Sequence, residues 1–150
     1  MEQVNFIALC IAIAVVLGIG VRVMTWAYVG KGSVSVLFKE PIYTLPQLTA
    51  TAAGNKAAVY FQQGIDAYKS GNYRQAVEEF NQAIQLVSNL AEAYHNRGLA
   101  FANLRSDGDA VGNLLKASEL YQEQGDSDAI AIIKQNLQAL KQRKIDRENR

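Results

Sequence analysis

The chain has 150 residues, of which 49% are hydrophobic, and its formal net charge is +1. This length suits one compact domain plus one extra element. No region is basic enough for a nucleic-acid footprint. The single cysteine, Cys10, excludes a disulfide framework and a cysteine metal cluster.

The N-terminal stretch, residues 1–29, predicts a single transmembrane anchor. Eighteen residues from Val4 onward are apolar except for one amide side chain. As a helix they would be about 27 Å long, close to the roughly 30 Å hydrocarbon core of a bilayer. Arg22 follows at the far end, and Trp26 and Tyr28 lie where an aromatic belt would meet the headgroups.

Two other interpretations of this stretch fit less well. A cleaved signal peptide would begin with basic residues, but the first one here is Arg22. A buried soluble helix is rarely apolar on every face over such a length. Because Arg22, Lys31 and Lys39 follow the span, the positive-inside rule predicts a cytoplasmic or stromal location for everything after residue 30. A thylakoid or bacterial inner membrane would fit, with the N-terminus outside.

One side of the predicted span is a candidate packing surface. Cys10, Ala14, Gly18 and Arg22 recur every four residues, so they lie along one stripe of a helix. Three of them are small, and small residues at this spacing allow another helix to approach closely within lipid. The alternative is ordinary membrane-helix composition, with the span serving only as an anchor.

Residues 30–56 are predicted to be a linker. Pro41 and Pro46 exclude a continuous helix. One interpretation is a flexible tether. The other is that a cluster of large apolar residues docks on a neighbouring protein or on the lipid surface; the cluster consists of Val36, Leu37, Phe38, Ile42 and Tyr43.

Residues 57–124 repeat one pattern twice, at an interval of 34 residues. Such a period, with small residues at fixed offsets, is typical of stacked helix pairs. Glycine and alanine mark the places where two helices can approach closely, and bulky residues fill the space beside them. The recurring pairs are Tyr60 and Tyr94, Gly64 and Gly98, Ala76 and Ala110, Ala83 and Ala117, and Leu86 and Leu120.

This pattern resembles the tetratricopeptide repeat (TPR). The first copy has signature residues at Tyr60, Gly64, Gly71, Tyr73, Ala76, Phe80 and Ala83, and the second at Tyr94, Gly98, Phe101, Ala110 and Ala117. The resemblance implies an all-α fold with two helix pairs, at 57–90 and 91–124. The turn is Gly71-Asn72 in the first copy, whereas the second copy has Arg105 to Asp109 there, which leaves its geometry open.

Residues 125–150 predict a capping helix followed by a charged tail. Gly125 stops the preceding helix, and Asp126 can cap a new one. A single apolar stripe then follows, made of Ile130, Ile133, Leu137 and Leu140. Terminal repeats need such a cap, because an open stack would expose its last apolar face.

The resemblance also implies a binding surface on the concave face, formed by the first helix of each pair. An apolar, aromatic groove of this kind suits an apolar helix or an extended segment. Alternatively, the capping helix or the linker fills the groove. Changing Phe61 and Leu99 to serine is expected to abolish partner capture without loss of helix. The predicted groove residues are Phe61, Gln62, Ile65, Tyr68, His95, Asn96 and Leu99.

We find no catalytic, metal or cofactor motif in the sequence, and we expect no enzyme activity. The layout predicts a membrane-tethered protein-interaction module, an adaptor or assembly factor for a membrane protein complex. It is similar to that of photosynthetic-membrane assembly factors. The alternative is a permanent accessory subunit of such a complex. The expected partners are proteins in or at the membrane, with lipid around residues 4–29, and neither nucleic acid nor a small-molecule substrate.

Overall fold

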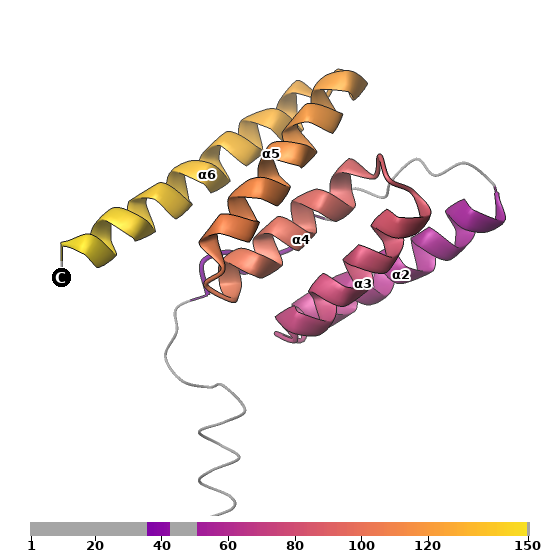
Figure 1. Ribbon diagram of the computed structural model, residues 1–150, viewed down its shortest axis with the longest axis horizontal. Coiled ribbons are helices and arrows are strands. Elements are labelled where there is room, and N and C mark those ends of the chain that lie inside the picture. The colour runs from indigo at the N-terminus through magenta and orange to yellow at the C-terminus, as the bar shows by residue number, and fades with distance from the viewer. Residues whose placement is uncertain (1–35, 43–50, 150) are drawn as a thin grey trace, which may run out of the picture. The chain divides into compact units, whose positions relative to one another are not determined.

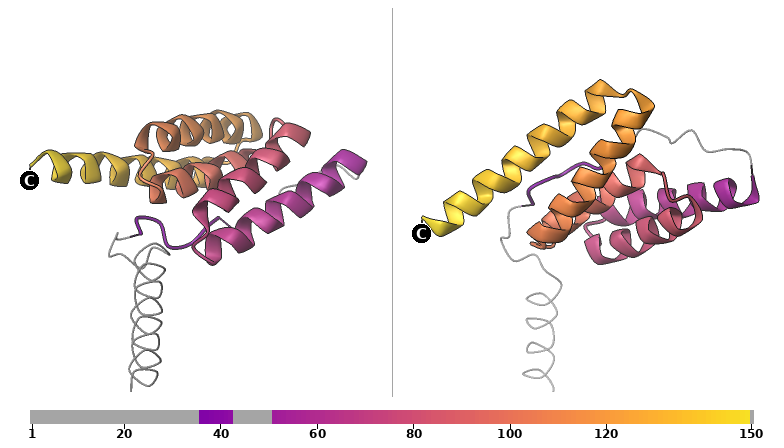
Figure 2. Two further views of the ribbon diagram at one scale, coloured as in Figure 1. Left: turned by 60° about the horizontal axis from the view of Figure 1, so that its bottom comes forward. Right: turned by 45° about the horizontal axis from the view of Figure 1, so that its top comes forward.

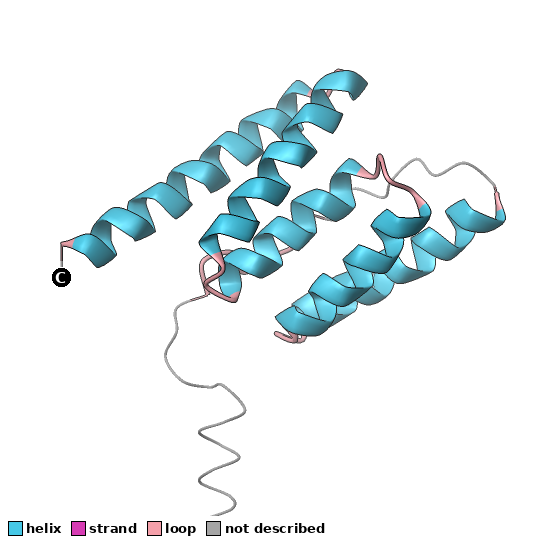
Figure 3. Cartoon of the chain, viewed as in Figure 1, coloured by secondary structure: helices cyan, strands magenta, loops and turns pink. Residues whose placement is uncertain are grey.

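The computed structural model describes residues 36–42 and 51–149, and these ranges contain helices and no strand. The all-α prediction is therefore confirmed for them. The predicted span at 1–29, with its stripe of small residues, lies outside the described residues. No helix within the two described ranges is long and apolar enough to cross a membrane. The helices are α2 (Ala52–Lys69), α3 (Tyr73–Leu86), α4 (Ala91–Asn103), α5 (Asp107–Gln124) and α6 (Ser127–Glu148) (Figures 1 and 3).

The helices form two hairpins that stack on each other. Helix α2 packs against α3 and α4 against α5, while α3 joins the hairpins by packing on α4, and α6 covers α5 (Figure 1). The first helix begins at Ala52 and not at residue 57, because Thr51 caps it: the Thr51 hydroxyl accepts a hydrogen bond from the Gly54 N–H at 3.1 Å. The predicted linker is correspondingly shorter.

Small residues allow each pair of helices to approach closely, as the sequence predicts. A Cβ atom on Gly64 would lie 2.6 Å from the Phe80 ring, and one on Gly98 would lie 3.0 Å from Leu114. Ala83 and Ala117 are fully buried. The bulky partners therefore occupy the space that the two glycines leave free, and this is the packing that the 34-residue pattern encodes.

Three helices end in the same turn, although only two of them carry glycine there. Gly71, Arg105 and Gly125 all have positive φ, at 76°, 65° and 76°. After each, the next residue donates its N–H to the carbonyl five positions back, as in Ser106 to Phe101 at 2.9 Å. This is the Schellman motif. The second turn thus has ordinary geometry, but an arginine adopts the conformation that favours glycine.

Replacing Arg105 by glycine should raise the free energy of unfolding by about 1 kcal/mol, because a left-handed conformation costs a non-glycine residue about 1–2 kcal/mol. Urea unfolding followed by circular dichroism measures the change. Gly71→Ala is the matched control, and it should lose a similar amount at a turn of the same geometry. An unchanged or lowered stability for Arg105→Gly would contradict this explanation of the turn.

Helix α6 forms the predicted cap on the second hairpin. Ile133 and Leu140 of its apolar stripe are buried, and Asp126 caps its start by accepting from the Ala129 N–H at 2.9 Å. Near its other end, Arg143 pairs with Asp107 and also donates to the Ala102 carbonyl at 2.8 Å. The helix is therefore fixed at both ends, by the turn that precedes it and by the turn between α4 and α5.

Candidate functional site, a clamp for an extended segment

Residues 36–42 lie in an extended conformation against α2 and α4 (Figure 2). Three side chains of those helices bind this segment through its main chain, and we call them the clamp: Tyr68, Asn96 and Asn103. Tyr68 comes from α2, the first helix of the first hairpin. The two asparagines come from α4, the first helix of the second hairpin. The clamp is therefore built from the two helices that were expected to line the concave face.

At one end of the clamp, Asn103 and Tyr68 form hydrogen bonds with both backbone groups of Phe38, its N–H and its C=O. The side-chain oxygen of Asn103 accepts from the N–H groups of Leu37 and Phe38, at 3.1 and 3.0 Å. The Phe38 carbonyl accepts from the Asn103 amide at 2.8 Å and from the Tyr68 hydroxyl at 2.7 Å. Burial raises the pKa of Tyr68 above its ordinary value, so this hydroxyl remains protonated and available as a donor.

The other end of the clamp holds Ile42 as a neighbouring β-strand would. The oxygen of Asn96 accepts from the Ile42 N–H at 2.7 Å, and its amide donates to the Ile42 carbonyl at 3.0 Å. Asn96 is fully buried, so the segment supplies the partners that a buried amide requires.

The two asparagines match the spacing of the segment. They are seven residues apart on one helix, which places them on the same face about 10 Å from each other. Ile42 lies four positions after Phe38, and a fully extended chain covers about 13 Å over that interval. A bend at Glu40 shortens this reach, so both contacts form at once.

The segment's side chains separate into anchors and exposed positions. Leu37, Phe38 and Ile42 pack, partly buried, against the hydrophobic core, and Pro41 is buried. Val36 is 39% exposed, and Lys39 and Glu40 are exposed. Leu37, Phe38 and Ile42 of the linker's apolar cluster therefore dock on the chain's own helices, which agrees with the alternative that the linker fills the groove and not with a free tether or with docking on a neighbouring protein or lipid. The last member of the cluster, Tyr43, lies outside the described residues.

Only two of the predicted groove residues belong to the clamp, namely Tyr68 and Asn96. Phe61, Ile65 and Leu99 are each 2% exposed and form part of the core, with the Phe61 ring 5.7 Å from that of Phe80. Burial of Phe61 and Leu99 argues against the expectation that both could become serine without loss of helix. Losing a buried Phe or Leu side chain typically costs about 2–5 kcal/mol.

Gln62 and His95 have other partners. Gln62 is exposed and donates to Asp66 at 2.9 Å, one turn along α2. His95 is fully buried and faces α6, where the Asn136 amide donates to its Nε2 at 2.9 Å. Burial lowers the pKa of His95 to about 4, so the ring is neutral near pH 7. Its Nδ1 has no hydrogen-bond partner. His95 therefore belongs to the contact between α4 and α6.

Asn103 also lies on the concave face that the resemblance implies but is not among the seven predicted groove residues, although it carries three of the contacts to the segment. The available signal was its spacing: it lies two helical turns after Asn96, on the same face. An asparagine at such a position presents one donor and one acceptor together, which is what a peptide group needs.

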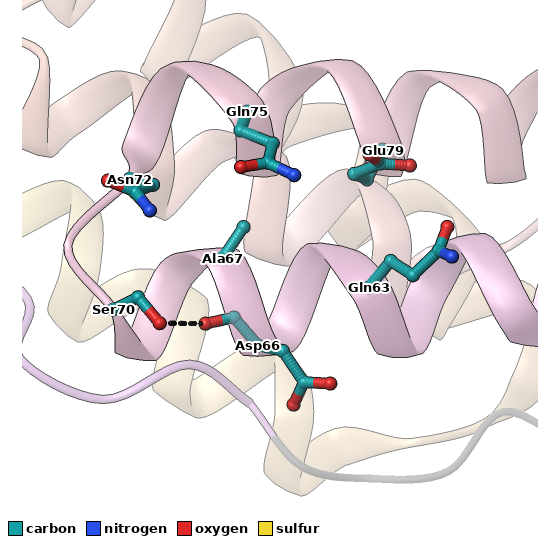
Figure 4. Close-up of a pocket in the computed structure, with 7 residues that line it drawn as sticks. All are labelled: Gln63, Asp66, Ala67, Ser70, Asn72, Gln75 and Glu79. Carbon is teal, nitrogen blue, oxygen red and sulfur yellow. Dashed lines mark hydrogen bonds between the residues drawn. The ribbon is translucent and has the colours of Figure 1, made fainter.

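A separate polar hollow of about 330 Å³ lies between α2 and α3 (Figure 4). The Ser70 hydroxyl donates to the Asp66 carbonyl there at 2.8 Å, which closes the end of α2. Across the described ranges, no three His, Cys, Asp or Glu side chains come together as a metal site would require. We assign the hollow no role. It is lined by Gln63, Asp66, Ala67, Ser70, Asn72, Gln75 and Glu79.

A fragment of residues 36–150 should be monomeric, helical and more stable than one that begins at Asn55. The compact unit begins at Val36. Starting at Asn55 removes both the segment and the Thr51 cap, and a lost cap alone costs about 1 kcal/mol. Urea unfolding and analytical ultracentrifugation of both fragments check this. Equal stability would mean that the segment contributes nothing to the fold.

Comparison with known families gives one match. Residues 66–104 match a family model described as a TPR repeat, and they cover the end of α2, all of α3 and α4. No curated protein matches the chain. Residues 66–104 are therefore similar to a TPR repeat, and they lie within two stacked helix pairs that repeat at an interval of 34 residues.

Proposed function

We propose that the chain is a membrane-tethered TPR module that binds other proteins, and that it acts as an adaptor or assembly factor for a membrane protein complex. A TPR repeat indicates a protein–protein interaction module. The observation that carries the proposal is the clamp, in which Tyr68, Asn96 and Asn103 hold an extended segment by its peptide groups. A surface that satisfies a peptide backbone in this way is suited to binding protein.

The membrane part of the proposal rests on the sequence. Residues 4–29 are long and apolar enough to span a bilayer, and basic residues follow them. The TPR domain would then lie on the cytoplasmic or stromal side. Extraction of membranes at high pH should leave the chain in the pellet, and external protease should cut it on one side only. Release of the chain into the supernatant would contradict the anchor.

Affinity purification from detergent-solubilised membranes tests the adaptor role. An assembly factor should co-purify with precursors of a complex and not with the mature form. Asn96→Ala with Asn103→Ala should reduce co-purification, while Gln62→Ala, on the same domain but away from the clamp, should not. Recovery in fixed ratio with the mature complex would identify a permanent accessory subunit instead. No protein partner in any fraction would contradict both roles.

A further inference from the structure

The clamp recognises the main chain of the segment. Its six hydrogen bonds to residues 36–42 all go to backbone N–H or C=O groups, those of Leu37, Phe38 and Ile42. Main-chain recognition gives affinity and leaves specificity to the side chains that pack beside it, as in strand addition. A segment from another protein could therefore satisfy the same donors and acceptors.

The packed side chains define which segment would fit. Leu37 and Phe38 pack on the core, Lys39 and Glu40 are exposed, Pro41 is buried, and Ile42 packs on the core again. The pattern is two adjacent apolar residues, two polar residues, a proline and a final apolar residue. No charged side chain of the clamp selects a charged ligand, since Tyr68, Asn96 and Asn103 are all neutral.

The bound segment is also suited to exchange. Leu37, Phe38 and Ile42 are only partly buried, so they contribute only part of the hydrophobic free energy that full burial would give. The free energy lost by ordering the backbone of the segment is of the same order as the free energy gained from its hydrogen bonds. Only residues 43–51 connect it to α2, and a competitor on so short a connection has an effective concentration in the millimolar range.

We propose that residues 36–42 are a built-in competitor for the clamp, displaced by an extended segment of a partner protein with the apolar–apolar–polar–polar–proline–apolar pattern. This rests on the proposed function as a protein-interaction module. The clamp is then closed in the isolated chain and opens only for a ligand that outcompetes the attached segment.

The first test measures binding of a fluorescently labelled peptide, with the sequence of residues 34–43, to the full chain in detergent. Phe38→Ser with Ile42→Ser in the chain should bind the peptide at least about tenfold more tightly than wild type, which is the ratio expected when the attached segment leaves the clamp free in no more than about a tenth of wild-type molecules. Lys39→Ser is the matched control and should behave as wild type, since Lys39 is exposed between the anchors. Adding Asn96→Ala to the opened variant should abolish the gain.

Equal binding by wild type and the opened variant would overturn the proposal, and so would an opened variant that binds no peptide. Circular dichroism establishes that the opened variant remains helical. A wild-type chain that is a dimer, and becomes a monomer when its segment is mutated, would show that the segment occupies a second copy, and would overturn the proposal as well.

A second measurement needs no variant. Excess unlabelled peptide added to the wild-type chain should accelerate hydrogen exchange at the Leu37, Phe38 and Ile42 amides, which the clamp protects in the closed state. Unchanged exchange at saturating peptide would overturn the competition. If added peptide displaces the segment but no protein co-purifies from membranes, the adaptor role is contradicted, whereas the role of the segment as a competitor for the clamp is supported.

Discussion

Replacing Gly64 by alanine should lower the free energy of unfolding by about 2 kcal/mol. The new Cβ would lie 2.6 Å from a ring carbon of Phe80, well inside contact distance. The Phe80 ring cannot move away freely, because it is fully buried and packs against Phe61. Overpacking of a core in this way typically costs about 1–3 kcal/mol. The effect is local to the contact between α2 and α3, which forms the first hairpin.

Gly112 provides the matched control. It lies within α5, is exposed, and a Cβ atom there would meet nothing within 4 Å. Gly112→Ala should therefore raise stability, by about 0.5–1 kcal/mol, because alanine is the better helix former. The same substitution should thus have opposite signs at the two positions in urea unfolding of residues 36–150. A neutral Gly64→Ala would show that the Gly64–Phe80 contact is not as close as described.

Lowering the pH from 7 to 4 should cost the fold about 3 kcal/mol through His95 alone. Burial lowers the pKa of His95 from 6.5 to about 4, so the unfolded chain takes up a proton before the folded chain does. The contribution of His95 is therefore fully present above pH 6.5 and is lost as the pH falls toward 4. Each pKa unit corresponds to about 1.4 kcal/mol. Protonation would also place a hydrogen on Nε2, the nitrogen that accepts from the Asn136 amide in the neutral ring.

Glu92, one turn before His95, opposes this trend. Burial raises the pKa of Glu92 and outweighs a backbone hydrogen bond that lowers it, so the contribution of Glu92 to stability grows as the pH falls. The test is therefore a comparison with His95→Gln, which retains Glu92 and can still pair with Asn136. Wild type should lose about 3 kcal/mol more than the variant between pH 7 and pH 4. Parallel stability curves for the two proteins would contradict the buried neutral histidine.

Periodicity predicted the helix pairs because the packing that forms them repeats. The glycines at 64 and 98 and the stripe through Ile133 and Leu140 are local signals, and each has a counterpart in the structure. The turn at Arg105 could not be predicted in this way. Arginine disfavours positive φ, and Arg105 adopts it because α4 and α5 pack against each other as a hairpin.

Most of the clamp could not be predicted from the sequence, for a different reason. Its contacts join residues 30 to 66 positions apart and go to backbone groups, which every residue type carries. The family resemblance selected Phe61 and Leu99 as surface residues, but this small domain uses them to fill its core. Tyr68 and Asn96 lie on the predicted face, and they bind the linker, which was predicted only as an alternative to a partner protein.

Amide hydrogen exchange of residues 36–150 tests the clamp most directly. Leu37, Phe38 and Ile42 should exchange more slowly than unstructured amides in wild type and in Gln62→Ala, because each N–H donates to an asparagine side chain. In Asn103→Ala, the Leu37 and Phe38 amides should lose this protection while the helices keep theirs. Exchange of all three amides at the unstructured rate in the wild-type protein would contradict the clamp, and with it the peptide-binding role that rests on it.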